Sequence, residues 1–374
     1  MNSYRRRLLG ASAAAGALAG FPMVASAQEA IRWRWQGAWS AKDIFHEYAL
    51  DYARKVREMS GGRLRIEVLP ADAVVKPFAL LMAVNKGVLD GCHAVPAYWH
   101  HQNPAFSLFG SGPAFGMDAN NFLAWMAYGG GRALYDELLG RVMNLKVTGL
   151  LYGPMPTQPL GWFRKRIETA TELKGMKYRT AGLAVELFRE MGVAAEELAP
   201  QEIVPALAQG RIDAAEFNNP TSDRWLGLPD AAKICMLQSY HQPAEVFAIL
   251  VNGRRFDALP DDLKAIVRHA ADAASADMSW KALHRYSADY AWLKEEKGVA
   301  FHRTPPDVLR AQLVAWSALA KRMMQDNPTG EKVIRSQLAW ARRTVAWLQE
   351  ATVDSHMAYN HWFASVKTPP DGKS

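Results

Sequence analysis

The sequence predicts an α/β protein of two lobes, with strands that cross between the lobes and a long helix at the C-terminus. At 374 residues the chain is long enough for two hydrophobic cores. Its composition, with 49% hydrophobic and 22% charged residues, is typical of a globular protein. Residues 31–95 alternate between strand-like and helix-like patterns, whereas the chain from Pro260 onward is almost wholly helical in pattern.

The beginning of the chain predicts three parallel strands covered by helices. Apolar and polar residues alternate over 31–36, which is expected to be a strand at the edge of a sheet. A helix is expected over 43–58 and a second strand over 64–69. A further helix over 78–86 ends at a glycine, and a third strand follows over 88–95. This order favours a parallel sheet with helices on its faces.

Two segments are expected to connect the lobes. Residues 147–156 are strand-like and are then broken by glycine and proline, and residues 244–252 are an apolar strand that returns. These crossings place residues 28–156 and 245–285 in lobe I, and residues 157–244 and 286–330 in lobe II.

The C-terminal segment, residues 331–366, is expected to join two copies of the chain. Residues 331–363 predict one helix, far longer than is usual in a compact domain. Trp340, Leu348 and Met357 are spread along this helix and need another surface to cover them. A partner protomer is the simplest candidate, so we expect a homodimer.

Residues 1–27 have the pattern of an export signal. Arg5–Arg7 precede a weakly apolar Ala/Gly-rich run, and Ala25–Ala27 form a small-residue cleavage site. Twin arginines favour the Tat route. Tyr4 stands where Ser or Thr is usual and Gly10 stands where Lys is common, so general secretion stays open as the alternative.

The mature chain shows no sign of a nucleic-acid or membrane protein. Without the leader, the formal net charge falls from +7 to +4, and the basic residues are dispersed, which argues against nucleic-acid binding. No later segment has the roughly 18 consecutive apolar residues of a membrane span, so a soluble protein is expected. Cys92 and Cys235 each lie in an apolar segment, so we expect two buried thiols and no disulfide.

Arg179 is the main candidate for ligand binding. It ends a short strand predicted within residues 174–180, and a helix over 183–191 follows. In open α/β sheets, ligands bind at the carboxyl ends of strands. A planar guanidinium matches a carboxylate with two parallel hydrogen bonds. The alternative is a surface arginine on an edge strand.

Glu216 is the candidate for a cation site. It lies in a strand predicted over 211–217, after four small or apolar residues, so its carboxylate should be partly buried and must be paired or bind a cation. Gln158 and Gln242 each lie beside a predicted crossing. One carboxylate with two amide oxygens suits a hard, oxygen-preferring cation, although glutamine alone is a weak metal signal.

Enzyme motifs are missing from the sequence. It has no G-x-S-x-G elbow, no H-E-x-x-H pair, no C-x-x-C and no Gly-rich phosphate loop. His100 and His101 are adjacent, and adjacent residues on a strand point to opposite faces. His241 with Asp223 is a conceivable acid/base pair for a hydrolase or lyase, but no nucleophile lies nearby in sequence.

Two segments carry a resemblance to a known family. Residues 172–179 (ELKGMKYR) and 209–216 (QGRIDAAE), with the leader and two α/β lobes, resemble the solute-binding subunits of tripartite ATP-independent periplasmic (TRAP) transporters. The similarity spans nearly all of the mature chain. It is closest to the branch that binds small 2-oxo or 2-hydroxy monocarboxylates, such as pyruvate or lactate, with a cation. Residues 96–99 and 239–242 belong to this likeness.

The resemblance implies roles for the candidate residues. An arginine at the position of Arg179 grips the substrate carboxylate in that family. A tryptophan often follows the glutamate there, whereas this chain has Phe217, which can wall the site but cannot donate an indole hydrogen bond. The residues expected to contact substrate are Arg179, Gln158, Tyr98, Phe217 and Asn218, and those expected at the cation site are Gln158, Glu216, Phe217 and Gln242.

A charge count favours sodium over calcium. Arg179 and a monovalent ion supply two positive charges, and Glu216 and the substrate carboxylate supply two negative charges. Because a buried site favours neutrality, sodium would balance. Calcium would leave one positive charge uncompensated unless Asp223 or another acid joins the site.

We therefore predict a solute-binding protein of the periplasm and not an enzyme. The resemblance implies the two-lobed periplasmic binding protein fold, which closes around its ligand by a hinge motion. It also implies two partners, the membrane subunits of a TRAP transporter and a second copy of the chain joined through the C-terminal helix. The alternative is a binding protein for a different or larger organic acid without a metal.

Overall fold

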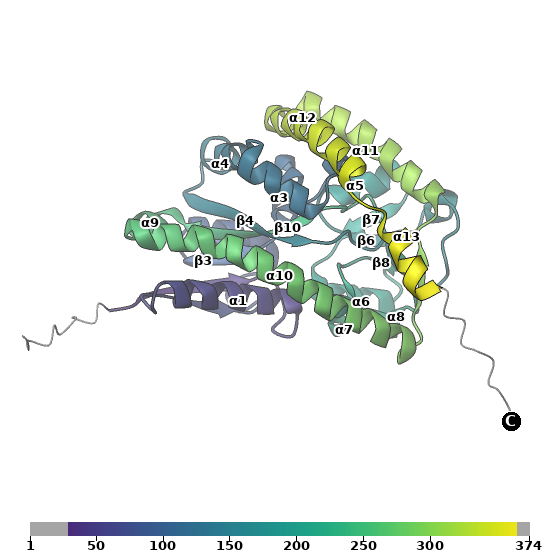
Figure 1. Ribbon diagram of the computed structural model, residues 1–374, viewed down its shortest axis with the longest axis horizontal. Helices are drawn as coiled ribbons and strands as arrows, with labels where there is room; N and C mark the ends of the chain where they lie inside the picture. Colours follow the sequence, from purple (N-terminus) through teal and green to yellow (C-terminus); the bar gives the residue numbers. More distant parts are fainter. Residues whose placement is uncertain (1–28, 365–374) are drawn as a thin grey trace, which may run out of the picture.

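The computed structural model describes residues 29–364, so the predicted export signal and residues 365–374 lie outside the described part. It contains two separate sheets, each with its own helices, and Figure 1 shows the two resulting lobes side by side. The predicted two-lobed α/β fold is confirmed.

The first sheet has five strands and forms lobe I. Its strands are β1 (Ile31–Gly37), β2 (Leu64–Leu69), β3 (Gly91–Ala94), β4 (Val147–Met155) and β10 (Glu245–Asn252). Their order is β2-β1-β3-β10-β4, and β10 is antiparallel to both of its neighbours. The prediction that the first strand is an edge strand is wrong, because β1 pairs with both β2 and β3. The alternation of apolar and polar residues indicates that one face of a strand is exposed, but it does not indicate how many neighbouring strands pair with it.

The helices of lobe I cover this sheet. Their bounds are α1 (Ile44–Met59), the 3₁₀ turn η1 (Pro77–Ala79), α2 (Leu80–Asn85), the 3₁₀ helices η2 (Pro96–Trp99), η3 (Pro104–Phe109) and η4 (Ala114–Gly116), α3 (Ala119–Tyr128), α4 (Gly131–Asp136) and the π-helical turn η5 (Glu137–Val142). Asp43 caps α1, because its carboxylate accepts a hydrogen bond from the backbone N–H of Phe45.

The second sheet has six short strands and forms lobe II. Its strands are β5 (Gly161–Phe163), β6 (Lys177–Thr180), β7 (Ala194–Glu197), β8 (Ala214–Ala215), β9 (Ile234–Leu237) and β11 (Ala300–Arg303), in the order β11-β9-β5-β8-β6-β7. Its helices are η6 (Ala170–Leu173), α5 (Leu183–Glu190), α6 (Pro200–Ala208), α7 (Pro220–Leu226) and α8 (Leu228–Ala231). The strand predicted over 211–217 is too long, because only Ala214 and Ala215 pair within the sheet.

Two connections and one long helix join the lobes. The chain passes from β4 to β5 and returns from β9 to β10, and the two connections lie side by side, because the Gln158 N–H donates to the Gln242 carbonyl at 3.2 Å. Helix α10 (Asp261–Glu295) runs along both lobes (Figure 1). It packs on α1 and β4 in lobe I and on α7 in lobe II. The predicted boundary at 285/286 lies inside α10, and the lobe limits stay predictions.

The C-terminal segment is two helices and not the single helix expected over 331–363. After α9 (Gly253–Asp257) and α10, the chain forms α11 (Pro306–Asp326), α12 (Pro328–Ala351), α13 (Ser355–Tyr359) and the π-helical turn η7 (Asn360–Ala364). Thr352 is extended, and the Asp354 carboxylate caps α13 through the backbone N–H of His356. A β-branched pair, Thr352 and Val353, before an N-cap residue is a helix-breaking signal that the apolar spacing does not report.

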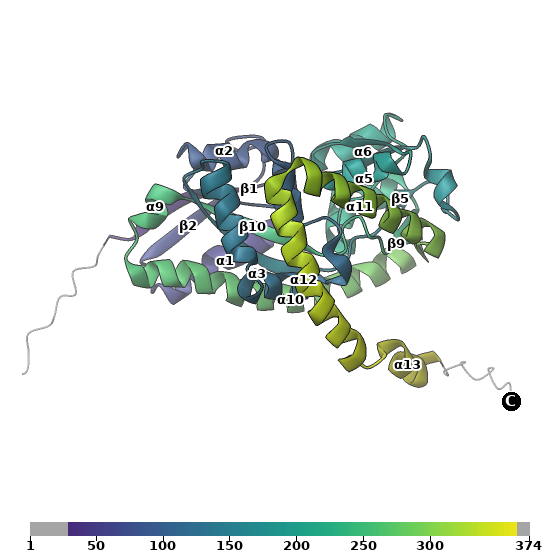
Figure 2. The same ribbon diagram turned by 90° about the horizontal axis from the view of Figure 1, so that it is seen from above.

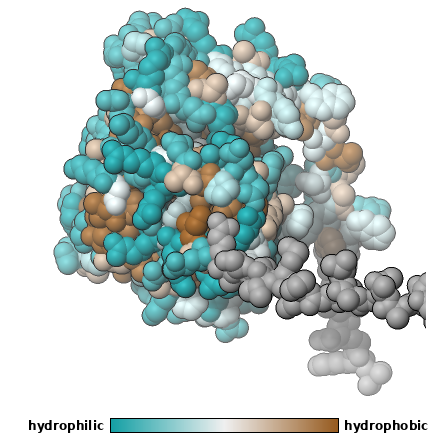
Figure 3. Space-filling view, turned by 90° about the vertical axis from the view of Figure 1, so that its left-hand side faces the viewer, coloured by the Kyte–Doolittle hydropathy of each residue, from teal (hydrophilic) through white to brown (hydrophobic). Residues whose placement is uncertain are grey.

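The polarity of the surface and the burial of the two cysteines match what the composition predicts. Figure 3 shows one end of the molecule as a mixed surface with separate hydrophobic patches. Within residues 29–364, no helix is both long enough and apolar enough to cross a membrane. Cys92 and Cys235 are both buried and unpaired, and they lie on β3 and β9 of different sheets, so the expectation of no disulfide is confirmed.

Candidate functional site

One small cavity lies where the connections between the lobes meet. Its volume is about 20 Å³, which is roughly the room for one ordered water. Every residue predicted for the substrate or the cation lines this cavity. The lining residues are Trp39, Phe45, Val95, Tyr98, Gln158, Arg179, Ala181, Glu216, Phe217, Asn218, Gln242 and Glu245.

The ends of two neighbouring strands deliver the charged pair of the cavity. Arg179 lies in β6, and Glu216 follows β8 directly, so the parallel pairing of these strands places both at one edge of the sheet. Their side chains are 2% and 1% exposed, and Arg179 Nη1 lies 2.9 Å from Glu216 Oε1. The alternative of a surface arginine on an edge strand is wrong, because β6 lies between β8 and β7.

Most hydrogen-bond donors of Arg179 are already engaged by lobe II. Nε and Nη2 donate to the Leu198 carbonyl at 3.0 and 2.9 Å, and Nη1 donates to the carbonyl and the carboxylate of Glu216 at 2.8 and 2.9 Å. A guanidinium has five N–H groups, so one N–H of Nη2 is left. Two parallel bonds to a ligand carboxylate therefore require Glu216 to release Nη1.

Glu216 carries a buried carboxylate with an altered pKa. Burial raises its pKa to about 7, and the opposing effects of Arg179 and Thr180 are smaller. His241 Nε2 lies 4.0 Å from Glu216 Oε2, but burial lowers the pKa of His241 to about 3, so this imidazole is neutral. Arg179 is thus the charged partner of Glu216.

Glu245, the first residue of β10, is a site residue that the sequence analysis missed. Its Oε2 accepts hydrogen bonds from Gln158 Nε2 at 2.5 Å and from Asn218 Nδ2 at 2.8 Å, and its Oε1 accepts one from Gln242 Nε2 at 2.9 Å. Burial raises the pKa of Glu245 to about 8. A charged residue at the head of a fully buried strand was the available signal, because such a charge needs a partner or a function.

The polar groups of the cavity fit a cation that prefers oxygen. Gln158 Oε1 is buried and has no hydrogen-bond partner among the described residues, so an acceptor is left over. Glu216 and Glu245 add two carboxylates. Residues 29–364 contain no group of three or more His, Cys, Asp and Glu side chains placed to hold a metal, so a cation here depends on amide oxygens and on the ligand.

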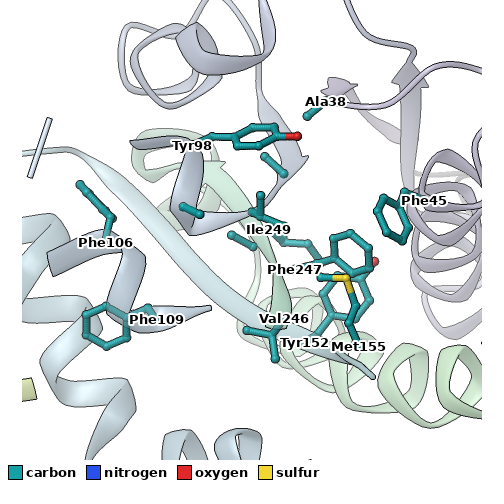
Figure 4. Packing of buried hydrophobic residues seen from close by; sticks show 14 of the residues in the cluster. Ala38, Phe45, Tyr98, Phe106, Phe109, Tyr152, Met155, Val246, Phe247 and Ile249 are labelled. Atoms are coloured by element: carbon teal, nitrogen blue, oxygen red, sulfur yellow. The ribbon is translucent and has the colours of Figure 1, made fainter. Parts of the chain in front are cut away.

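Aromatic side chains of lobe I close the other side of the cavity. Phe45 lies 6.0 Å from Phe217 and 4.8 Å from Phe247, measured between ring centroids, and Figure 4 shows Phe45 beside Phe247 in the core. The Tyr98 ring packs edge-on against Phe78 at 4.8 Å. Phe217 lies 6.0 Å from the Arg179 guanidinium carbon. These contacts place rigid apolar walls around the charged groups.

The histidines considered in the sequence do not line the cavity, although His241 lies behind Glu216. His241 bonds to Ser239 through Nδ1, and Asp223 accepts from the Trp162 indole and from the Asn218 backbone, so neither bonds to the other. His100 and His101 follow η2 in a turn and not in a strand, so the expected strand geometry is wrong for them. They bond to Glu186 and Glu197 of lobe II at 2.9 and 2.8 Å.

Comparison with known proteins identifies the family. A family model described as bacterial extracellular solute-binding protein, family 7, matches residues 36–327. The chain is 32% identical over 258 residues to a monocarboxylate 2-oxoacid-binding periplasmic protein of Nostoc sp. (strain PCC 7120 / SAG 25.82 / UTEX 2576), and the match covers 69% of each protein.

Two solved structures of TRAP periplasmic solute-binding proteins have the same fold. One, from Colwellia psychrerythraea with bound calcium and pyruvate, has a TM-score of 0.80 and 27% identity, over 90% of this chain and 100% of that one. The other, from Pseudoalteromonas atlantica T6c with bound sodium and pyruvate, has a TM-score of 0.81 and 28% identity, with the same coverage. The predicted family is confirmed: the chain belongs to family 7 of the bacterial extracellular solute-binding proteins and is a solute-binding protein of the TRAP transporter type.

Proposed function

We propose that this protein captures a small 2-oxo or 2-hydroxy monocarboxylate, of the size of pyruvate or lactate, together with a cation. The observation that carries the proposal is one small cavity, lined by buried residues, that combines an arginine, two carboxylates and amide side chains. Arg179 would bind the carboxylate of the ligand. Gln158, Glu216 and Gln242 would hold the cation, which supplies positive charge for the carboxylate and 2-oxo oxygens. The Nostoc relative and both pyruvate-containing structures support this class of ligand.

Binding between two lobes implies a hinge. Tyr98 and Phe45 reach the cavity from lobe I, whereas Arg179 and Glu216 reach it from lobe II, so a bound acid would hold the lobes together. The paired connections around Gln158 and Gln242 are two of the places where the chain passes between lobes. The closed form would deliver its ligand to the membrane subunits of a TRAP transporter, after export of the chain to the periplasm on its Tat-like leader.

A thermal-shift screen of the mature, dialysed protein tests this function. The panel contains 2-oxo and 2-hydroxy acids of increasing size, each in sodium, in calcium and in chelator. A ligand that binds only the native state stabilises it by about 2.7 kcal/mol at a concentration of a hundred times Kd. A saturable shift with pyruvate- or lactate-sized acids and no turnover is expected. A response only to bulkier acids, indifferent to cations, would instead support a metal-free pocket.

We also propose that the C-terminal helices join two copies of this chain. Trp347, Met357, Trp362 and Phe363 are 64–72% exposed on α12, α13 and η7. Figure 2 shows the end of α12 and α13 projecting from the body. Large exposed hydrophobic side chains at this density are typical of a contact surface.

Removal of the projecting segment is expected to give monomers. A chain that ends at Ala346 keeps Val333, Ile334 and Ala341, which pack on the body, and loses only the exposed end. Sedimentation velocity or gel filtration with light scattering then measures the mass. Trp280→Ser, an equally exposed tryptophan on α10, serves as the control and should stay dimeric. A dimer of the shortened chain would place the interface elsewhere.

A further inference from the structure

We propose that Glu245 makes the cation site of this protein selective for a divalent ion such as calcium over sodium. This inference rests on the proposed function and adds to it the charge of the cation. Glu245 was absent from the charge count that favoured sodium, and it lines the same cavity as Arg179 and Glu216.

The count of buried charges changes with this third acid. When every acid is ionised, Arg179 supplies one positive charge, and Glu216, Glu245 and the ligand carboxylate supply three negative charges. Burial favours the protonated form of Glu245 when no cation is present, so a bound cation must displace that proton for the third negative charge to form. A divalent cation makes the sum zero, whereas sodium leaves one negative charge uncompensated. Glu245 is 4% exposed, so water does little to screen such an excess.

The nearby acids outside the cavity do not alter this count. Asp223 does not line the cavity, and its two oxygens accept from the Trp162 indole and from the Asn218 backbone. Asp43 caps α1 and accepts from the Ser222 hydroxyl. Glu245 is therefore the acid that joins the site.

The hydrogen bonds of Glu245 tie it to the proposed cation ligands. It binds the amide nitrogens of Gln158, Asn218 and Gln242. These bonds fix the orientation of each amide, and in Gln158 they leave Oε1 as a buried acceptor without a partner. A carboxylate in this position both orients the amide ligands and adds the charge that a hard divalent ion prefers. The two pyruvate-containing relatives hold different cations, so likeness alone does not choose between them.

Glu245→Gln tests the inference, because it keeps the shape of the side chain and removes the charge. Pyruvate is titrated calorimetrically into chelator-treated protein in calcium chloride and, separately, in sodium chloride. Bound calcium is also measured by elemental analysis after dialysis. In the unaltered protein, affinity in calcium should exceed affinity in sodium by at least about tenfold, and the variant should lose or reverse this preference. Glu202→Gln, the same change at an exposed position in α6, should keep it.

Each outcome separates the two proposals. Equal affinity in sodium and calcium for the unaltered protein, or an unchanged preference in Glu245→Gln, would overturn the role of Glu245 and leave the monocarboxylate site standing. No binding of pyruvate or lactate in either cation would overturn the proposed function itself. If Glu245→Gln does not fold, Glu245→Asp takes its place: it keeps the charge and should therefore keep the preference for calcium.

Discussion

Replacement of Arg179 by alanine is expected to reduce the affinity for a small 2-oxo acid by about thirtyfold or more. Loss of one partner from a buried, hydrogen-bonded charge pair costs about 2–5 kcal/mol of binding free energy, and about 1.4 kcal/mol corresponds to a factor of ten. The change also leaves Glu216 without its charged partner, so the cavity would repel the ligand carboxylate.

Calorimetric titration of pyruvate into Arg179→Ala measures this loss. Arg322→Ala is the matched control, because Arg322 forms a surface ion pair with Glu190 on the outside of the molecule. Arg179→Lys adds a second comparison. It keeps a positive charge but cannot reproduce the two bonds to the Leu198 carbonyl, so its affinity should stay far below that of the unaltered protein. Retained affinity in a folded Arg179→Ala protein would remove this arginine from the site.

Glu216→Gln is expected to weaken binding by about tenfold to a hundredfold, and added cation should restore part of the loss. Glutamine keeps an oxygen for the cation but removes one buried negative charge, so the ion is held less tightly. It also weakens the bond that holds Arg179 Nη1, which favours the carboxylate of the ligand and limits the loss.

The measurement is the affinity for pyruvate at a series of cation concentrations. Glu202→Gln is the matched control, since it makes the same change at an exposed position in α6, away from the cavity. Its affinity should depend on the cation in the same way as that of the unaltered protein. If Glu216→Gln bound pyruvate as tightly as the unaltered protein at every cation concentration, Glu216 would have no part in holding the ion.

The sequence predicted Arg179 and Glu216 as site residues because both obey a simple rule. Arg179 and Glu216 each stand at the end of a short strand before a break, and parallel strands end at one edge of a sheet. Gln158 and Gln242 lie beside the crossings, and the antiparallel pairing of β4 with β10 brings those crossings together. The resemblance then named the chemistry that these positions serve.

Other features depend on contacts that the chain does not encode locally. Glu245 heads a strand buried along its whole length, and two of its three partners, Gln158 and Asn218, lie 87 and 27 positions away. For this reason the charge count that favoured sodium did not include Glu245. The break after Ala351 depends on a cap at Asp354, which outweighs the apolar spacing.

Direct binding of pyruvate to the cavity between the lobes is the most decisive measurement. Chelator-treated mature protein is titrated with pyruvate by calorimetry, first without added cation, then in calcium and in sodium, and the series is repeated with Arg179→Ala. We predict saturable binding of one pyruvate per chain that requires a cation and disappears in the variant. Binding that ignores both the cation and Arg179, or no binding under any of these conditions, would contradict the proposed site.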